Sequence, residues 1–193
     1  MFGGAACFLF SLFFFIVKMA EKVMSKIGIF YGSTTGNTEE VANELMASFS
    51  DKGEVEVADI AQCDAGSFED CDLVLLGTST WGAGELQDDW QAFIDSTDGV
   101  DLKGKKVALF GLGDQFGYPD NFVDGMKYIK DFAKYCGAEV IGNWPTDEYE
   151  YDESLAEEGG EFIGLVIDND NQSNMTDDRV SKWAEQVISQ SGI

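Results

Sequence analysis

The most informative segment of the chain is Gly28-Ile29-Phe30-Tyr31-Gly32-Ser33-Thr34-Thr35-Gly36-Asn37-Thr38. Its first residues are apolar and predict a strand, and a helix is expected to begin near Thr38. The loop between them, residues 32–38 (the hydroxyl-rich loop), can direct backbone N–H groups and a helix N-terminus at one point. The sequence therefore predicts a phosphate site there, with hydroxyl donors from Ser33, Thr34, Thr35 and Thr38.

The hydroxyl-rich loop contains no Lys or Arg. It is therefore not a Walker loop, which needs Gly-Lys-Ser/Thr. A phosphate held by neutral donors indicates a resident cofactor rather than a nucleotide that is turned over. A simpler alternative is a Ser/Thr-rich turn that only caps the following helix.

From Ser25 onward, strand and helix patterns alternate along the chain. Strands are expected at 26–31, 54–59, 72–77 and 106–111, with a fifth that begins at 139–142 and resumes at 162–168. Helices are expected at 38–50, 88–96, 121–136 and 176–189, the last with Thr176 as N-cap. Repeated βα units predict an α/β three-layer sandwich, with a five-stranded parallel sheet between two layers of helices. Ligands of such sheets bind at the carboxyl ends of the strands.

The composition excludes several functions. With 36 acidic against 12 basic residues the net charge is -24, which repels nucleic acid and anionic membranes and favours a basic protein partner. No histidine is present, so Cys/His zinc sites and Ser-His-Asp or Cys-His catalysis are excluded. The four cysteines form no CxxC motif and are expected to be reduced and mostly buried: Cys7, Cys63, Cys71 and Cys136.

The N-terminal run, residues 2–17, carries no charge and is followed by Lys18, Lys22 and Lys26. It is about as short as a membrane span can be, and it lacks the flanks of a signal peptide. Two interpretations stay open. Residues 1–23 are either an extension that the fold does not need, as from an incorrectly assigned start, or a membrane or targeting segment. Residues 24–193 are expected to form one domain.

Two further loops follow the third and fourth strands. Each places one aromatic residue, Trp81 or Tyr118, among glycines and small polar residues. Two aromatic rings across a cleft suit a flat π-system stacked between them. The alternative is that each ring covers the core beneath its own loop. Because the hydroxyl-rich loop ends at the same sheet edge, the ligand site is favoured.

Three motifs carry a family resemblance: Gly-Ser-Thr-Thr-Gly-Asn-Thr at 32–38, Thr-Trp-Gly-Ala-Gly-Glu-Leu at 80–86, and Gly-Asp-Gln-Phe-Gly-Tyr-Pro-Asp-Asn-Phe at 113–122. Asp-Asn-Asp-Asn-Gln-Ser at 168–173 and Thr-Asp-Asp-Arg at 176–179 extend it. From Ser25 to the C-terminus the sequence resembles a long-chain flavodoxin. The resemblance implies a flavodoxin-like fold, non-covalent FMN, and a low-potential one-electron carrier that shuttles between semiquinone and hydroquinone rather than an enzyme.

The resemblance also implies a role for particular residues. The FMN phosphate would be held by Ser33, Thr34, Thr35, Gly36, Asn37 and Thr38, and the ring system would lie between Trp81 and Tyr118. Thr80 and Asp170 would lie near the ribityl chain, and Gly82 and Ala83 would face N5. Gly113, Asp120 and Asn121 would line the pyrimidine edge, with Asp114 in the same loop. In the family, the peptide after this Trp turns over when the flavin is reduced, which Gly82 makes easier.

The resemblance implies redox partners with basic faces: a ferredoxin/flavodoxin-NADP reductase, low-potential oxidoreductases and, in a phototroph, photosystem I. A monomer in the cytoplasm is expected, or in the plastid stroma of a eukaryotic alga. Residues 144–162 (the acidic insertion) match the segment that splits strand five in long-chain members, and serve as a solvated loop or as a docking site. Alternatives are a flavodoxin-like NAD(P)H-dependent quinone reductase, for which no second Gly-rich fingerprint is present, and a receiver-type signalling domain, for which the acid pocket is missing.

Overall fold

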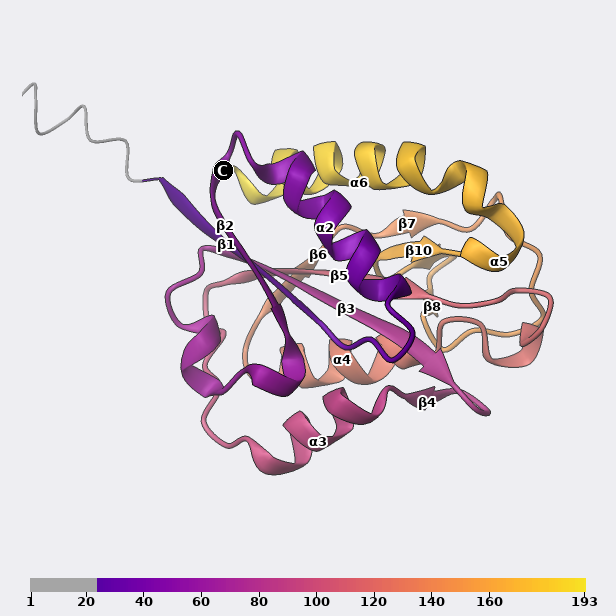
Figure 1. Cartoon of the computed structure of the whole chain (residues 1–193), viewed down its shortest axis with the longest axis horizontal. Coiled ribbons are helices and arrows are strands. Elements are labelled where there is room, and N and C mark those ends of the chain that lie inside the picture. The colour runs from indigo at the N-terminus through magenta and orange to yellow at the C-terminus, as the bar shows by residue number, and fades with distance from the viewer. Residues whose placement is uncertain (1–23) are drawn as a thin grey trace, which may run out of the picture.

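A computed structural model describes residues 24–193. The main strands are β1 (Ser25–Tyr31), β2 (Gly53–Asp59), β3 (Leu73–Trp81), β5 (Lys106–Leu112) and β10 (Leu165–Ile167), and they lie parallel in the order β10-β5-β3-β1-β2. The longer helices are α2 (Asn37–Phe49), α3 (Asp88–Ser96), α4 (Gly125–Tyr135) and α6 (Thr176–Ser191). In Figure 1, α2 and α6 lie on one side of the sheet and α3 and α4 on the other. The three-layer flavodoxin-like sandwich is confirmed.

The register of the sheet brings four loops to one edge. Tyr31 pairs with Gly77, and Ser79 pairs with Leu112, which in turn pairs with Ile167. The central strands lie in the interior of the domain because most of their side chains are apolar on both faces. In β3 every residue up to Thr78 is buried. The segments that follow Tyr31, Ser79, Leu112 and Ile167 therefore leave the sheet beside one another.

The predicted interruption of strand five is confirmed. β6 (Glu139–Ile141) pairs with the first half of β5, and β10 pairs with its second half, both in parallel. The acidic insertion between them is not an unstructured loop. It forms a small antiparallel sheet of β7 (Trp144–Pro145), β9 (Glu161–Phe162) and β8 (Glu157–Glu158).

The acidic insertion has an aromatic core of its own. Tyr149 lies 5.8 Å from Phe122 and 5.3 Å from Phe162, measured between ring centroids. Its hydroxyl donates to the Val166 carbonyl oxygen at 2.6 Å, and the guanidinium of Arg179 lies 4.2 Å from its ring centroid. Arg179 is itself buried on α6. Aromatic contacts and a buried cation therefore fix the insertion to the domain.

Three boundary predictions need correction. The helix predicted from Asn121 begins at Gly125, because Val123 has a positive φ of 53° that no α-helix accommodates. Thr176 is not an N-cap, since α6 already includes it and its hydroxyl donates to Asn169 Oδ1 at 2.7 Å. The resumed strand five begins at Leu165, not at Phe162, which pairs within the small sheet.

Other parts of the chain match their predictions. Cys63 is half-buried and Cys71 and Cys136 are buried, and all three are free thiols. Cys7 and the apolar N-terminal run lie outside the described residues. Between residues 24 and 193 no helix combines the length and the apolar character that a bilayer span requires.

Candidate functional site

The hydroxyl-rich loop is fixed at both ends. Gly32 N–H donates to the Gly77 carbonyl oxygen at 3.0 Å, and a side chain at Gly32 would collide with Gln87 and with Trp90. Gln87 is buried, accepts from the first N–H groups of α3, and donates to Thr34 Oγ1 at 3.4 Å. The close approach that only glycine permits therefore holds this loop against the sheet and α3.

The loop leaves its donors free for a ligand. Gly36, with φ of 94°, is the N-cap of α2, and no side chain caps the helix. Within the described chain, the N–H groups of Thr34, Thr35, Asn37 and Thr38 have no protein acceptor. The loop is therefore not a turn whose Ser or Thr side chain caps the helix. Unpaired N–H groups at a helix N-terminus form a site for an anion.

Residues 80–86 (the tryptophan loop) form a tight hairpin. Trp81 pairs with Glu85 where β3 meets β4 (Glu85–Leu86), and the turn contains two glycines with positive φ, Gly82 at 53° and Gly84 at 99°. Ala83 N–H donates to Glu85 Oε2 at 2.5 Å, and Trp81 Nε1 donates to Ser79 Oγ at 2.9 Å. Most of these bonds join residues within the loop itself.

Residues 113–122 (the tyrosine loop) turn around the carboxylate of Asp114. Its Oδ1 accepts from Phe116 N–H at 3.1 Å, from Gly117 N–H at 2.8 Å and from Asn171 Nδ2 at 2.8 Å. These bonds, that from Gly117 foremost, hold the pKa of Asp114 below its usual value although partial burial opposes the shift. The ionised carboxylate therefore fixes the turn that carries Tyr118.

A second carboxylate, that of Asp168 directly after β10, also fixes the tyrosine loop. Asp168 is fully buried, and its Oδ2 accepts from the backbone N–H of Gln115 at 3.1 Å and from Gln115 Nε2 at 2.7 Å. Asn171 donates to the same carboxylate through N–H and Nδ2. Gln115 Oε1 in turn accepts from Glu150 N–H at 2.6 Å. The network joins three segments that are distant in sequence.

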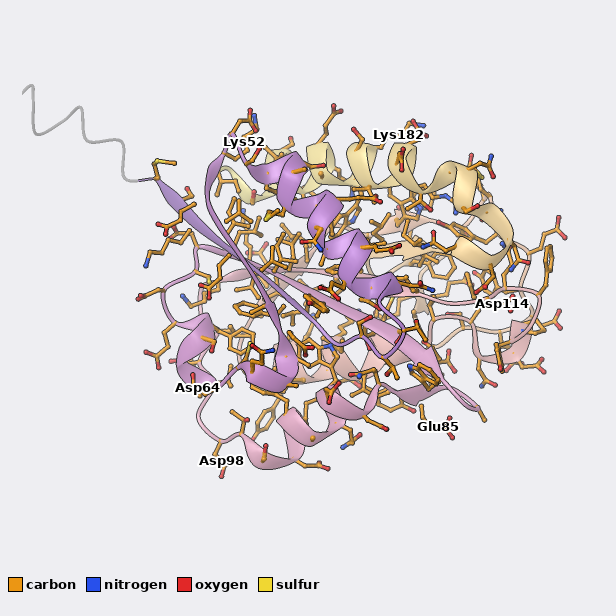
Figure 2. All side chains as sticks on the ribbon, in the orientation of Figure 1. Lys52, Asp64, Glu85, Asp98, Asp114 and Lys182 are labelled. Atoms are coloured by element: carbon orange, nitrogen blue, oxygen red, sulfur yellow. The ribbon has the colours of Figure 1, made fainter. Side chains whose placement is uncertain are left out.

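The loops enclose one cavity of about 320 Å³ at the sheet edge. Thr35 and Asn37 line it at the hydroxyl-rich loop, and Trp81 and Tyr118 line it at the other loops. The two aromatic side chains are 41% and 58% exposed, and neither stacks on a ring of the part of the chain that the structure describes. Neither ring is therefore buried as part of the hydrophobic core. In Figure 2, the Glu85 and Asp114 side chains mark this end of the molecule.

Comparisons with known proteins agree with this geometry. The family model described as flavodoxin matches residues 29–183. The chain belongs to the flavodoxin family. It is 46% identical to the flavodoxin of Picosynechococcus sp. over 85% of this chain and 96% of that protein, and 43% identical to the flavodoxin of Helicobacter pylori over 85% and 97%. A crystal structure of Fusobacterium nucleatum flavodoxin bound to flavin mononucleotide has a TM-score of 0.81 at 30% identity, covering 86% of this chain and 99% of that one.

Flavodoxins are electron-transfer flavoproteins, so the family confirms the prediction of an electron carrier rather than an enzyme. Most of the predicted flavodoxin site residues line the cavity: Thr35, Asn37, Thr80, Trp81, Gly82, Gly113, Asp114, Tyr118, Asn121 and Asp170. Ser33, Thr34 and Gly36 lie in the hydroxyl-rich loop beside it, and Thr38, the last residue of that loop, is buried. Ala83 and Asp120 instead line a neighbouring groove.

Five residues of the cavity wall were not predicted: Ser79, Leu112, Phe122, Val123 and Asn169. Leu112 is the last residue of β5 and Asn169 lies two residues after β10, so strand position alone could have indicated them. Nothing in the sequence indicates that Val123 lines the cavity. Its position depends on a positive φ, which β-branched residues rarely adopt and which the sequence therefore does not predict. Its conformation follows from tertiary contacts on either side of it.

Proposed function

We propose that this chain carries FMN and transfers single electrons between redox proteins. One observation carries the proposal: a single cavity has free hydroxyl and N–H donors at one end and two unstacked aromatic rings at the other. This arrangement suits a molecule with a phosphate tail and a flat ring, as FMN has.

The donor set fits FMN at each part of the molecule. We assign the phosphate to residues 33–38, the ring system to the space between Trp81 and Tyr118, and the ribityl chain to Thr80 and Asp170. We assign the rim of the ring to backbone groups of Gly82, Gly113 and Asn121, which line the cavity, and of Ala83 and Asp120, which line the adjoining groove. Asp114 holds the shape of the tyrosine loop.

When bound, FMN supplies the one-electron chemistry, and the protein sets its potential. No Lys or Arg of the described chain lines the cavity, while Asp114 and Asp170 do. Negative surroundings disfavour additional negative charge on the ring, which makes the reduced cofactor a stronger reductant. The hydroxyl-rich loop binds the phosphate without positive charge that would ease reduction.

Redox partner proteins follow from the family. We propose that they present basic faces, because the chain has a net charge of -24 and complementary charge steers association. Ferredoxin/flavodoxin-NADP reductase, low-potential oxidoreductases and photosystem I are the proposed classes. We further propose that residues 24–193 act as the carrier domain without residues 1–23, in the cytoplasm or the plastid stroma.

Absorption spectroscopy tests the cofactor. The purified protein should be yellow with quenched flavin fluorescence, and a reductive titration should resolve two one-electron steps. Mixing the holo-protein with NADPH alone should leave the flavin oxidised. Rapid bleaching by NADPH would instead support the quinone reductase, and a colourless protein that takes up no added FMN would contradict the proposal.

Substitutions at the two rings test the stacking. Trp81→Ala and Tyr118→Ala should each weaken FMN binding about tenfold, on the order of 1.4 kcal/mol, because each removes one face of the ring contact. Tyr135→Ala is a matched control, since Tyr135 is 92% exposed at the opposite end of α4. Fluorescence titration of the apo-protein measures all three affinities. Unchanged affinity in the first two variants would exclude stacking between these rings.

A further inference from the structure

An open groove of about 430 Å³ lies beside the cofactor cavity. Its walls come from the tryptophan loop, the tyrosine loop, α4 and the acidic insertion, through Ala83, Asp120, Asn121, Asp124, Tyr128, Glu153, Ser154 and Leu155. Asn121 lines both the groove and the cofactor cavity. Whatever occupies the groove therefore lies next to the cavity that we propose holds the ring.

The wall contributed by the acidic insertion is held in place residue by residue. The N–H groups of Asp152 and Glu153 both donate to the Pro119 carbonyl oxygen, at 2.9 and 3.0 Å. Ser154 Oγ donates to the Phe122 carbonyl oxygen at 2.5 Å. Leu155 N–H donates to Oδ1 of the buried Asp124 at 2.7 Å. The side chains of this strip are thus presented on a fixed backbone, which lowers the entropy lost on docking.

The groove combines apolar surface with unpaired negative charge. Tyr128 is 44% exposed and Leu155 is 52% exposed, so both offer apolar surface in the groove. The carboxylates of Asp120 and Glu153 form no ion pair with any basic residue of the described chain. The neighbouring lysines of α4 are already neutralised.

These lysines pair away from the groove. Lys127 pairs with Asp131 one turn along the helix, and Lys130 pairs with Glu158 of the acidic insertion. The positive charges close to the groove are therefore neutralised by other residues, whereas the carboxylates that line the groove, Asp120 and Glu153, have no cationic partner in the described chain. The groove is acidic and partly apolar at once.

We propose that this groove receives a lysine or arginine side chain of the redox partner and so fixes the partner beside the cofactor; the inference rests on the proposed function. The aliphatic stem of such a side chain packs on Leu155, and its cationic head reaches Glu153 and Asp120. Tyr128 offers a ring face for a cation–π contact. A second copy of this chain fits poorly, because it carries the same charge of -24.

The consequence is a defined role for the acidic insertion. Its strip 152–155 supplies both a charge and an apolar contact at a site that touches the cofactor cavity. Docking there would place the partner's electron acceptor or donor near the exposed ring edge between Trp81 and Tyr118. The insertion would thus orient the partner, while the overall charge only attracts it.

The test uses the photoreduced full-length holo-protein and cytochrome c, a probe whose haem edge is surrounded by lysines. Stopped-flow measurements give the rate constant for electron transfer over a range of ionic strength. Glu153→Gln should lower it about threefold at low ionic strength and reduce its salt dependence, because one charge contact is lost. Leu155→Ser should lower it about threefold at every ionic strength, because the loss is apolar.

Each variant has a control of the same chemistry. Glu69→Gln changes an exposed carboxylate that precedes β3, at the other end of the sheet, and Tyr135→Ser removes an exposed apolar side chain from the far end of α4. Both should stay within about 1.5-fold of the wild-type rate constant. Groove variants that match their controls would overturn the proposal.

FMN affinity separates this inference from the proposed function. All four variants should bind FMN as the wild type does. A slower rate that accompanies weaker FMN binding would overturn the docking role, because the groove would then act through the cofactor. A wild-type protein that binds no FMN, or does not reduce cytochrome c, would instead contradict the proposed function.

Discussion

The tryptophan loop and the tyrosine loop both form walls of one cavity but are held differently. In the tryptophan loop most hydrogen bonds join near neighbours, as from Ala83 to Glu85. The tyrosine loop is bonded to residues distant in sequence, such as Asp168 and Glu150. A locally bonded hairpin can change one peptide at small cost, whereas a loop bonded to two distant segments cannot. The site thus pairs a fixed wall with an adjustable one.

The largest effect is expected from Asp168→Asn, which removes the charge that fixes the tyrosine loop. The new amide would direct a donor group toward Gln115 Nε2 or Asn171 Nδ2, which are donors themselves. We expect the free energy of unfolding to fall by about 3 kcal/mol, because a fully buried, hydrogen-bonded carboxylate is lost. Urea denaturation of the apo-protein measures it, and FMN affinity should fall as well.

Asp98→Asn provides the control for Asp168→Asn. Asp98 is exposed in the segment after α3, and Figure 2 shows it at the opposite end of the view from Asp114. Its substitution should change the free energy of unfolding by less than about 0.5 kcal/mol. If Asp168→Asn were as mild, the tyrosine loop would not depend on its long-range bonds.

A smaller effect is expected in the tryptophan loop. Gly82→Ala places a side chain at a φ of 53°, where it also meets Glu85 Oε2. The free energy of unfolding should fall by about 1 kcal/mol, and the separation between the two one-electron potentials of bound FMN should decrease. Spectroelectrochemistry measures the potentials.

Gly99→Ala distinguishes general strain from an effect on the site. Gly99 also has a positive φ, 86°, and an added side chain there meets nothing within 4 Å. It should lower the stability by a similar amount and leave both potentials unchanged. Potentials that respond no more to Gly82→Ala than to Gly99→Ala would show that the tryptophan loop is not the adjustable wall.

The smallest effect concerns pH. The fold lowers the pKa of Asp114 below its ordinary 3.8 through the bonds from Gly117, Asn171 and Phe116. Folding favours the ionised form of Asp114. The carboxylate therefore contributes to the stability of the folded state above pH 3.8, and this contribution is lost as the pH falls through the lowered pKa. Asp114→Asn should therefore weaken FMN binding about twofold at pH 7 and flatten its loss on acidification.

Flavin fluorescence recovered on acidification follows the release of FMN. The matched variant Glu85→Gln changes a carboxylate of the tryptophan loop, and it should keep the wild-type response to acid. An Asp114→Asn protein with the full wild-type response would show that another carboxylate controls the tyrosine loop.

Much of the fold could be predicted because it depends on local periodicity. The continuous apolar runs at Leu73–Leu76 and Val107–Phe110 indicate strands that are covered on both faces of the sheet. Helix α3 was predicted at its observed bounds. The start of α4 could not be predicted. Asn121 and Phe122 follow a helical pattern, but bonds from the acidic insertion hold this segment in a loop, with Val123 at positive φ.

Residue types at short spacing were enough to predict the succession of strands and helices along the chain, the neutral character of the hydroxyl-rich loop and the identity of the two aromatic rings. Which wall of the cavity is fixed, and that a groove adjoins the cavity, became clear from long-range contacts in the folded chain. The bonds of Asp168 to Gln115 and of Leu155 to Asp124 join residues 53 and 31 positions apart. Contacts over such separations form only when the whole sheet brings its strand ends together, so no local pattern can encode them.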